Sequence, residues 1–520
     1  MATERTTALT GGRVLTMAPG ARPATTVVVG DGRVVAVGGD DVLAAHPDAV
    51  VHDVGGRTVV PGLIDAHHHL SLVALHPRWA DLSGATTVAE VAAALVEQAA
   101  REPDARWVRG AGWEHPVGLS AADLDAIGLD RPIMVGHYSL HQAAVSSAGL
   151  DELGISAATP DPDGGRILRD ESGRPTGVLL ERAWGEAHAR SMSDYEDPDR
   201  WGDLIVERAR QLIAEGVTAV HDAACSPAAE AVYGSLARAG RLPLSVLALP
   251  HPPALFSTPD LSRLDGPPTG EGNEWLRVGP VKLFADGGMA IAVDATRGGR
   301  RRQAGLLFPG VFDGAVAAAT RGFRVAVHAM GNAGLEVALT AFEELERRFP
   351  AGDQRARVEH VSLASPGQLR RMAQLGVVGV VQPGLVPVLG ANVAHLAFED
   401  VDWMPFASAR EAGVRLAGST DAPCADFHPL PATAGGVSRT VAPGVRLGPE
   451  EALDYPTWLE AWTAGSALAG GQEGERGRLA PGLRADLVVL DGGLDLDAPP
   501  RVAQTWVAGR LVHDAGPAAP

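Results

Sequence analysis

The chain has 520 residues, of which 46% are hydrophobic and 21% are charged, and its formal net charge is −19. These proportions are ordinary for a folded protein with a large buried core, so they exclude wholesale disorder. The negative charge repels phosphate backbones and anionic bilayers, so we expect no nucleic acid and no membrane as a partner. No apolar run reaches the roughly 20 residues that a membrane-spanning helix needs, and no secretion signal is visible.

Cysteine content indicates the compartment. Cys225 and Cys424 are too few for a disulfide framework and fit a reducing, cytoplasmic environment. Each follows a strand-end aspartate by three positions, so it could face a cavity, but we favour small buried side chains for both.

Both ends of the chain are rich in short β-branched runs between glycine turns. We predict short antiparallel strands at 12–17, 25–29, 33–37, 52–54, 485–490, 502–508 and 510–513. Since chain termini often lie close together, the pattern favours one small β-sandwich built from both ends, covering 1–58 and 475–520.

The middle of the chain alternates apolar strands with helical patterns, which is typical of an α/β protein. The predicted strands are 59–69, 217–222, 244–250, 278–286, 324–328, 357–361, 377–382 and 414–421, and clear helices cover 201–215, 335–349 and 366–375. Eight such units predict a (β/α)8 TIM-like barrel made of 59–70 and 205–474. The residues between its first two strands, 71–204, are predicted to form an insertion over the barrel mouth.

Polar residues gather where the predicted strands end, and in such a barrel these ends meet at one mouth. Strand one ends with His67, His68 and His69, and because strand residues two apart share a face, His67 and His69 point together while His68 points away. The ends of later strands add His328, His360 and Asp421. This nitrogen and oxygen set suits zinc or a similar divalent ion. His221 also lies at a strand end and is either a substrate contact or structural.

Lys282 is the single lysine of the chain, beside 43 arginines. A bias toward arginine explains why other lysines are absent but not why this one is present. Arginine cannot replace lysine where a reactive primary amine is needed, so we expect Lys282 to take part in the chemistry.

Several motifs together resemble the amidohydrolase superfamily, and more narrowly amidohydrolase family 3, the branch that includes N-substituted formamide deformylases. They occur in the expected order along the whole chain: PGLIDAHHHL at 61–70, GAGW at 110–113, GVTAVHD at 216–222, KLFADG at 282–287, HAMGN at 328–332, VEH at 358–360, GSTDAP at 418–423 and GRLAPGLRADLVVL at 477–490. The loops after strands seven and eight depart from the family pattern, so the resemblance supports the metal site better than the substrate pocket.

The resemblance implies roles for the matched residues. His67, His69 and Asp421 would hold one metal, and His328 and His360 a second. Lys282 would carry a CO₂-derived carbamate that bridges the two, although part of the superfamily uses one metal. A small-molecule substrate and, by analogy, a homodimer are implied; His141 and Trp113 are candidate substrate contacts.

The predicted function is hydrolysis of a non-peptide C–N bond, in an amide, N-acyl or N-formyl compound, by metal-activated water with Asp421 as general base and proton shuttle. Cyclic amidase and deaminase activities are alternatives within the superfamily. A Schiff-base lyase or aldolase using Lys282 is an alternative from another class, and a non-catalytic binding protein is a third.

Overall fold

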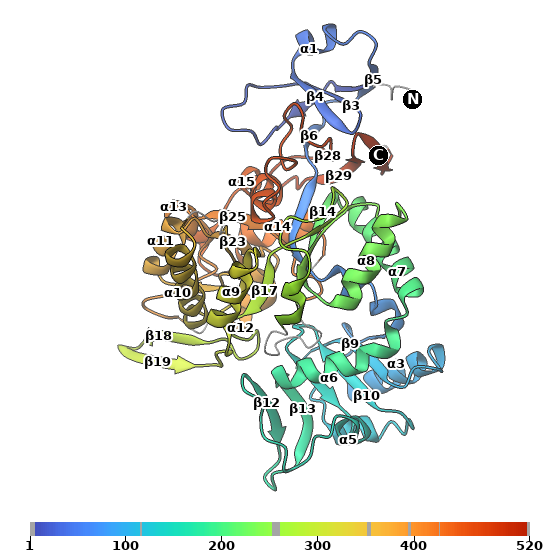
Figure 1. Cartoon of the computed structure of the whole chain (residues 1–520), viewed down its shortest axis with the longest axis vertical. Helices are drawn as coiled ribbons and strands as arrows, with labels where there is room; N and C mark the ends of the chain where they lie inside the picture. The colour runs from blue at the N-terminus through green and yellow to red at the C-terminus, as the bar shows by residue number, and fades with distance from the viewer. Residues whose placement is uncertain are drawn as a thin grey trace.

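The structure is a computed structural model that describes residues 6–114, 117–251, 261–350, 355–393, 397–425 and 427–516. Three parts follow one another from top to bottom in Figure 1: sheets from both chain ends, an α/β body, and a mixed sheet with its own helices. No helix within these ranges is long and apolar enough to cross a membrane.

Two sheets contain the strands from the chain ends. One has the order β4-β3-β1-β5 and the other β2-β6-β28-β29-β30. The bounds are β1 Thr7–Thr10, β2 Arg13–Val14, β3 Thr26–Gly30, β4 Arg33–Gly38, β5 Val50–Asp53, β6 Thr58–Pro61, β28 Leu487–Asp491, β29 Arg501–Val507 and β30 Arg510–Asp514. β6 pairs antiparallel with β28, and Val27, Val59, Leu487 and Trp506 share one apolar cluster.

The predicted pattern of these end strands needs two corrections. Residues 7–10 form β1, which the sequence prediction left out, and the pairs β1–β5 and β2–β6 are parallel rather than antiparallel. The chain passes through β3, β4 and the short helix α1 (Asp40–Ala44) before it reaches β5, and such a crossover permits parallel pairing.

The body contains two parallel sheets, ordered β16-β15-β14-β7 and β17-β20-β21-β23-β25. Their strands are β7 Leu63–His68, β14 Val217–Cys225, β15 Ser245–Pro250, β16 Leu276–Val278, β17 Val281–Phe284, β20 Val325–Ala329, β21 Arg357–His360, β23 Val378–Val381 and β25 Arg415–Gly418. On one side the chain passes from β16 directly to β17 through residues 279–280, and on the other Asp421 N, after β25, donates to His67 O in β7 at 2.8 Å. The arrangement is therefore α/β and TIM-barrel-like.

Two predicted strands of the body are each divided in two. Residues 59–69 are split between β6, which pairs with β28 in an end sheet, and β7, which pairs with β14. Residues 278–286 were expected to be continuous, but β16 ends at Val278 and pairs with β15, whereas β17 starts at Val281 and pairs with β20. Pro280 lies in the break, where its missing N–H cannot serve a ladder. The break lets the chain transfer from one sheet to the other.

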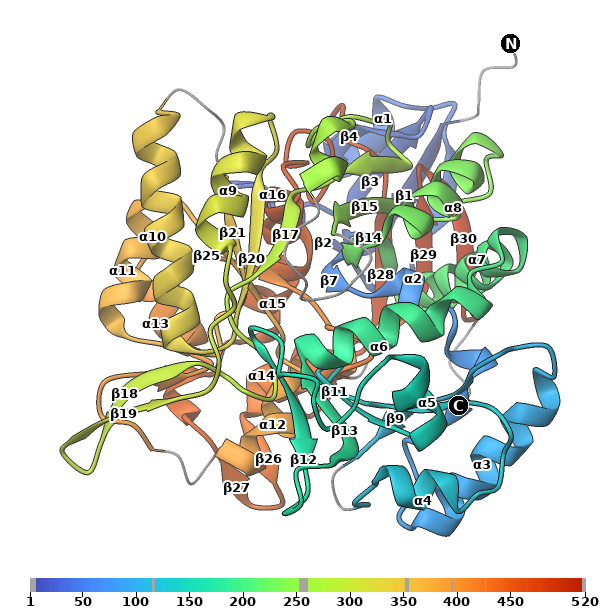
Figure 2. The same cartoon turned by 60° about the horizontal axis from the view of Figure 1, so that its bottom comes forward.

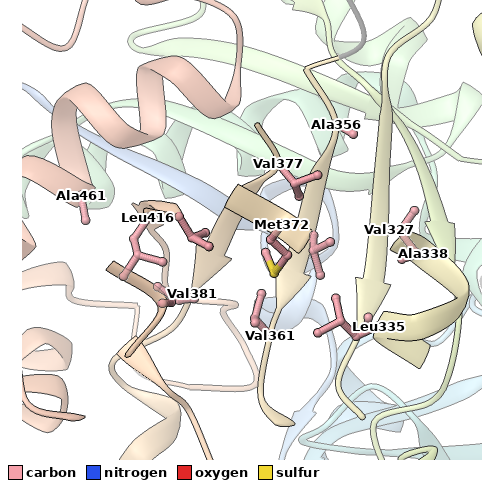
Figure 3. Close-up of a cluster of buried hydrophobic side chains, with 14 of the residues drawn as sticks. Val327, Leu335, Ala338, Ala356, Val361, Met372, Val377, Val381, Leu416 and Ala461 are labelled. Atoms are coloured by element: carbon pink, nitrogen blue, oxygen red, sulfur yellow. The ribbon is translucent and has the colours of Figure 1, made fainter. Parts of the chain in front are cut away.

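Helices cover the outside of the body: α7 Pro198–Ala214, α8 Pro227–Arg238, α9 Val311–Thr320, α10 Asn332–Arg348, α11 Pro366–Gln374 and α13 Phe406–Glu411. The start of α11 shows how the sequence fixes them, since Ser365 and Gln368 form a capping box and Pro366 occupies the first turn. Figure 3 shows Leu335, Ala338 and Met372 from these helices beside strand residues such as Val327. This apolar layer holds the strand ends in place.

The residues between β7 and β14 form a six-stranded sheet ordered β12-β13-β11-β10-β9-β8. Its elements are α2 Leu70–Val73, β8 Ala80–Asp81, α3 Val88–Arg101, β9 Val108–Trp113, α4 Ala121–Asp125, β10 Ile133–His137, β11 Gln142–Val145, α5 Ser147–Glu152, β12 Gly165–Arg169, β13 Pro175–Glu181 and α6 Arg182–Met192. Figure 2 brings this part, coloured blue to green, to the front. It touches the loop after β17, where Met289 N donates to Glu181 Oε1 at 2.9 Å.

The remaining elements lie in the loops of the body and in its last third. They are β18 Val293–Arg297, β19 Arg300–Ala304, β22 Leu363–Ala364, α12 Leu385–Val393, β24 Asp402–Trp403, α14 Pro429–Ser438, β26 Thr440–Ala442, β27 Val445–Arg446, α15 Tyr455–Glu460 and α16 Ser466–Ala469. The β18–β19 hairpin extends from one side of the body in Figure 1.

Candidate metal centre and active site

Three side chains converge where β7 and β25 end. Nε2 of His67 lies 3.4 Å and Nε2 of His69 lies 3.3 Å from Oδ1 of Asp421. Within the described ranges these three form a group of candidate ligands whose donor atoms all lie within 4.8 Å of one another. Asp421 has a φ of 58°, a strained backbone angle for a residue other than glycine, which is often kept at functional sites.

Hydrogen bonds from the Nδ1 atoms of the two imidazoles fix the orientation of both rings. His67 donates through Nδ1 to Glu359 Oε2 at 2.6 Å, and His69 donates through Nδ1 to the carbonyl of Ala223 at 2.9 Å. Glu359 accepts in turn from Nε of Arg357 at 2.6 Å. Although burial opposes the charged form, Arg357 and His67 hold the pKa of Glu359 well below its usual range. Such outer hydrogen bonds fix the tautomer of metal-binding histidines.

This geometry fits a cation. Because Nδ1 of both rings donates a hydrogen bond to a neighbour, Nε2 of each ring faces the carboxylate of Asp421. Burial, with the charge of Lys282, lowers the pKa of His67 to about 3, so its ring is neutral near pH 7. The lone pairs of Nε2 and of the Asp421 carboxylate repel one another when no proton lies between them. A divalent ion bound between them removes that repulsion. The three residues thus have the chemistry and orientation of a metal site.

A second set of polar side chains lies beside the first. Lys282 projects from β17, His328 from β20 and His360 from the end of β21. The ring of His360 lies 4.9 Å from that of His67 and 4.5 Å from that of His328, measured between centroids. His360 Nδ1 lies 3.0 Å from Oε1 of Gln382, which fixes the ring. The structure thus brings all six predicted metal-binding residues to one region.

Lys282 and His328 each present a buried nitrogen without a hydrogen-bond partner among the described residues. Nζ of Lys282 lies 4.9 Å from the ring centroid of Phe284, and the side chain is fully buried. Burial lowers the pKa of Lys282 to about 8. A buried ammonium without a hydrogen-bond partner is costly, so burial shifts this position toward the neutral amine.

These side chains line a cavity of about 70 Å³. Besides the six polar residues, its wall includes Tyr138, Leu140 and His141 from the insertion, Met289 from the loop after β17, and Cys424. A much larger cavity, of about 1340 Å³, lies next to it and shares Tyr138, Leu140, Met289 and Cys424. Cys424 thus faces both cavities, whereas Cys225 is fully buried among apolar side chains.

His141 reaches the cavity because Glu181 holds it. Its Nδ1 lies 2.6 Å from Glu181 Oε2, and Glu181 also accepts from the backbone N–H groups of Met289 and Ala290. A side chain at Gly288 would place its Cβ 2.5 Å from the His141 ring, so only glycine lets the loop pass here. Glu181 is fully buried with a φ of 53°. It carries no recognisable motif, and the sequence analysis missed it.

The two other candidate substrate contacts lie elsewhere. His221 is fully buried, and its Nδ1 accepts from Nη1 of Arg357 at 3.0 Å. Trp113 packs in the core of the insertion and donates through Nε1 to the carbonyl of Val117. Neither belongs to the described walls of the two cavities. The geometry favours structural roles for both, with His221 supporting Arg357.

Comparison with known proteins identifies the class. The amidohydrolase family model matches residues 50–513. N-substituted formamide deformylase from Arthrobacter pascens is 35% identical over 490 residues, which is 89% of each chain. The crystal structure of an uncharacterized metal-dependent hydrolase from Pyrococcus horikoshii OT3 superposes with a TM-score of 0.73 at 24% identity, covering 94% of this chain and 98% of that one.

The chain therefore belongs to the amidohydrolase family, which confirms the resemblance found in its motifs. It is a hydrolase that acts on carbon–nitrogen bonds other than peptide bonds.

Proposed function

We propose that His67, His69 and Asp421 bind one divalent ion, with zinc as the natural occupant of a site with imidazole and carboxylate ligands. The observation that carries this proposal is the convergence of two Nε2 lone pairs on the Asp421 carboxylate, at 3.4 and 3.3 Å. Glu359 and the carbonyl of Ala223 fix the rings for this task.

A second ion would be held by His328 and His360, with Lys282 as the bridge. The neutral amine of Lys282 attacks CO₂, an N–C bond forms, one proton is released, and the product is an anionic carbamate with two oxygen ligands. Full burial and a lowered pKa both favour the neutral amine that this reaction needs. A carbamate would also explain why the nitrogen of Lys282 is buried, which is unfavourable for a free ammonium.

Asp421 is the proposed general base and proton shuttle. A bound divalent ion would lower the pKa of a water molecule and polarise the scissile carbonyl. Asp421 accepts the proton of the attacking water and then donates it to the departing amine nitrogen, so that the C–N bond breaks and a carboxylic acid and an amine are released. His141, fixed by Glu181, faces the same cavity and would position the substrate carbonyl or nitrogen.

The substrate class we propose is a small N-acyl or N-formyl amine. Phe284, Leu385 and Leu389 give the 70 Å³ cavity apolar walls and leave room for a small acyl group. The relative from Arthrobacter pascens, whose name describes a formamide deformylase, supports the same class.

We further propose the division of the chain given above: a β-sandwich of 1–58 and 475–520, a closed (β/α)8 barrel of 59–70 and 205–474, and an insertion of 71–204. The hydrogen bond between Asp421 and His67 supports the barrel, whereas the pairing of β6 (Thr58–Pro61) with β28 extends the end sheet to Pro61, beyond the boundary at residue 58. A homodimer and a cytoplasmic location are proposals as well; the free thiols of Cys225 and Cys424 are compatible with the second.

Turnover of a panel of N-formyl and N-acetyl amines tests this function. Zinc-supplemented protein should hydrolyse at least one of them and lose activity in a chelator, and Asp421→Asn should lower kcat by about 100-fold or more. Activity that survives chelation, together with borohydride trapping at Lys282, would replace this proposal with Schiff-base chemistry.

A further inference from the structure

The cavity of about 1340 Å³ beside the candidate metal centre has an unusual polar wall. It is lined by three arginines, namely the exposed Arg101, Arg109 on β9 and the half-buried Arg208 on α7, and by His76, which follows α2. In a protein with a net charge of −19, positive groups gathered at one buried wall call for an explanation.

Arg208 has no ion-pair partner within the described part of the chain. Its guanidinium carbon lies 3.8 Å from the ring centroid of Phe427, and Nη1 donates to Oε1 of Gln211 at 2.9 Å. Its Nε is buried and makes no hydrogen bond there. Burial lowers the pKa of Arg208 to about 10, which still leaves the group charged near pH 7.

Arg109 is 2% exposed and is likewise without an ion pair among the described residues. Its guanidinium carbon lies 4.1 Å from the ring centroid of Trp79. Nη1 donates to the carbonyl of His188 at 3.3 Å and to Oγ of Ser191 at 2.5 Å, and Nη2 donates to Nδ1 of His188 at 3.2 Å. Its Nε, too, lacks a hydrogen-bond partner. Burial lowers the pKa of Arg109 to about 10, against the opposing effect of the charges of Tyr195, Glu196 and Asp194.

His76 links Arg208 and Arg109. Burial and the positive charges of Arg208 and Arg109 lower the pKa of His76 to about 4, so the three side chains lie close enough to interact. Nε2 of His76 is also buried without a described partner. The carboxylates on the same cavity, Asp81, Glu114 and Glu207, are exposed to solvent. The buried polar wall therefore offers hydrogen-bond donors and positive charge.

Desolvated guanidinium groups are costly unless an anion compensates them. We propose that this wall binds the carboxylate of an amide substrate, with Arg208 as the anion contact and with Arg109 and His76 beside it. The scissile bond would lie in the neighbouring 70 Å³ cavity, and the substrate would pass Tyr138 and Met289, which line both spaces. The recognised carboxylate is not changed in the reaction. This inference rests on the proposed function and narrows its substrates to acidic amides.

The anion contact is tested without turnover by comparing the affinity of the zinc-supplemented protein for benzoate with its affinity for benzamide. Trp79 and Trp184 line the cavity, so intrinsic tryptophan fluorescence can report occupancy. We expect benzoate to bind at least about tenfold more tightly than benzamide, and Arg208→Gln to weaken benzoate by about 10- to 100-fold, as for other charge-assisted hydrogen bonds. Arg208→Lys should retain part of the preference.

Arg210→Gln is the matched control, because Arg210 is exposed on the same helix and lies outside the cavity wall. Its benzoate affinity should equal that of the wild type. Equal binding of benzoate and benzamide, or benzoate binding that Arg208→Gln leaves intact, would overturn the inference.

Kinetics separate this inference from the proposed function. N-formyl ω-amino acids of increasing chain length are compared with the matching carboxamides, and the acids should show a higher kcat/KM that falls in Arg208→Gln. Equal hydrolysis of acids and carboxamides would refute the anion contact and leave the hydrolase proposal standing. If the protein hydrolyses neither series but still binds benzoate preferentially, in a way that depends on Arg208, the proposed N-formyl substrates are refuted and the anion site stands.

Discussion

Nδ1 of His67 lies 2.6 Å from Oε2 of Glu359, and both side chains are buried. Glu359 is itself held by Arg357, so a chain of charged groups runs from β21 to the candidate metal centre. Because a carboxylate accepts the Nδ1 proton, Nε2 of His67 must present its lone pair to the centre. The orientation of the proposed ligand thus depends on a residue that does not itself reach the cavity.

We expect Glu359→Gln to lower zinc affinity by about 10- to 100-fold, the usual cost of losing a partner of a ligating histidine. The amide keeps the size of the side chain but removes its charge. It can also donate a hydrogen bond, so it no longer fixes the tautomer of His67. Competition with a chromophoric chelator measures the affinity. Glu346→Gln, an exposed substitution on α10, is the control. Equal affinities in the two variants would show that Glu359 does not tune the site.

Removal of the amine of Lys282 should show whether the lysine is modified. Lys282→Met keeps an unbranched, buried side chain but cannot form a carbamate. We expect the native intact mass of the wild type to exceed the calculated value by one CO₂, and the excess to disappear in acid and in the variant. Zinc content should fall from about two ions to about one per chain, as expected for a bridged pair. An unmodified wild-type mass under native conditions would refute the carbamate.

Glu181→Gln should weaken substrate positioning rather than metal binding. Glu181 fixes His141 through a 2.6 Å contact, and neither residue belongs to the proposed ligand set. We therefore expect kcat/KM to fall by about tenfold or more, with unchanged zinc content. Glu186→Gln, exposed on α6, provides the control. A loss of zinc, or a loss of thermal stability as large as the loss of activity, would indicate a structural role instead.

The metal-free protein should lose stability as the pH falls from 7 to 5. Burial lowers the pKa of His67 to about 3 and of His360 to about 4, against an ordinary value of 6.5. Below pH 6.5 these histidines bind protons in the unfolded chain, whereas in the folded chain they stay unprotonated until the pH is much lower. Acid therefore favours unfolding. The thermal midpoint of chelator-treated protein, measured across this range, should fall less steeply in His360→Gln. A wild-type midpoint independent of pH would contradict neutral, buried imidazoles.

The strand ends of the body could be predicted because they combine a short apolar run with chemistry-bearing residues. Val325–Ala329, for example, contains His328 at the expected position, and Arg357–His360 ends at a predicted ligand. Parallel strands bring such ends together, so proximity of His67 and Asp421 followed from topology alone. The break at Pro280 was missed because both flanking segments are equally apolar.

The supporting residues could not be predicted in the same way. Glu181 lies 40 positions from His141, at the end of a strand in a sheet whose pairing the sequence does not reveal. Glu359 offered a weak signal, since two charged residues, Arg357 and Glu359, alternate within a short buried strand. Arg208 looked like an ordinary charged residue of an amphipathic helix, and only the cavity distinguishes it.

Metal content per chain decides whether His67, His69 and Asp421 bind an ion. Elemental analysis of protein purified in zinc-supplemented buffer should find at least about one ion per chain in the wild type, as a structural or catalytic zinc site requires. The double substitution His67→Gln and His69→Gln should abolish this binding. His68→Gln should retain it, because neither ring nitrogen of His68 has a hydrogen-bond partner among the described residues and the side chain does not line the cavity. A wild-type protein without metal, or equal metal in all variants, would contradict the account.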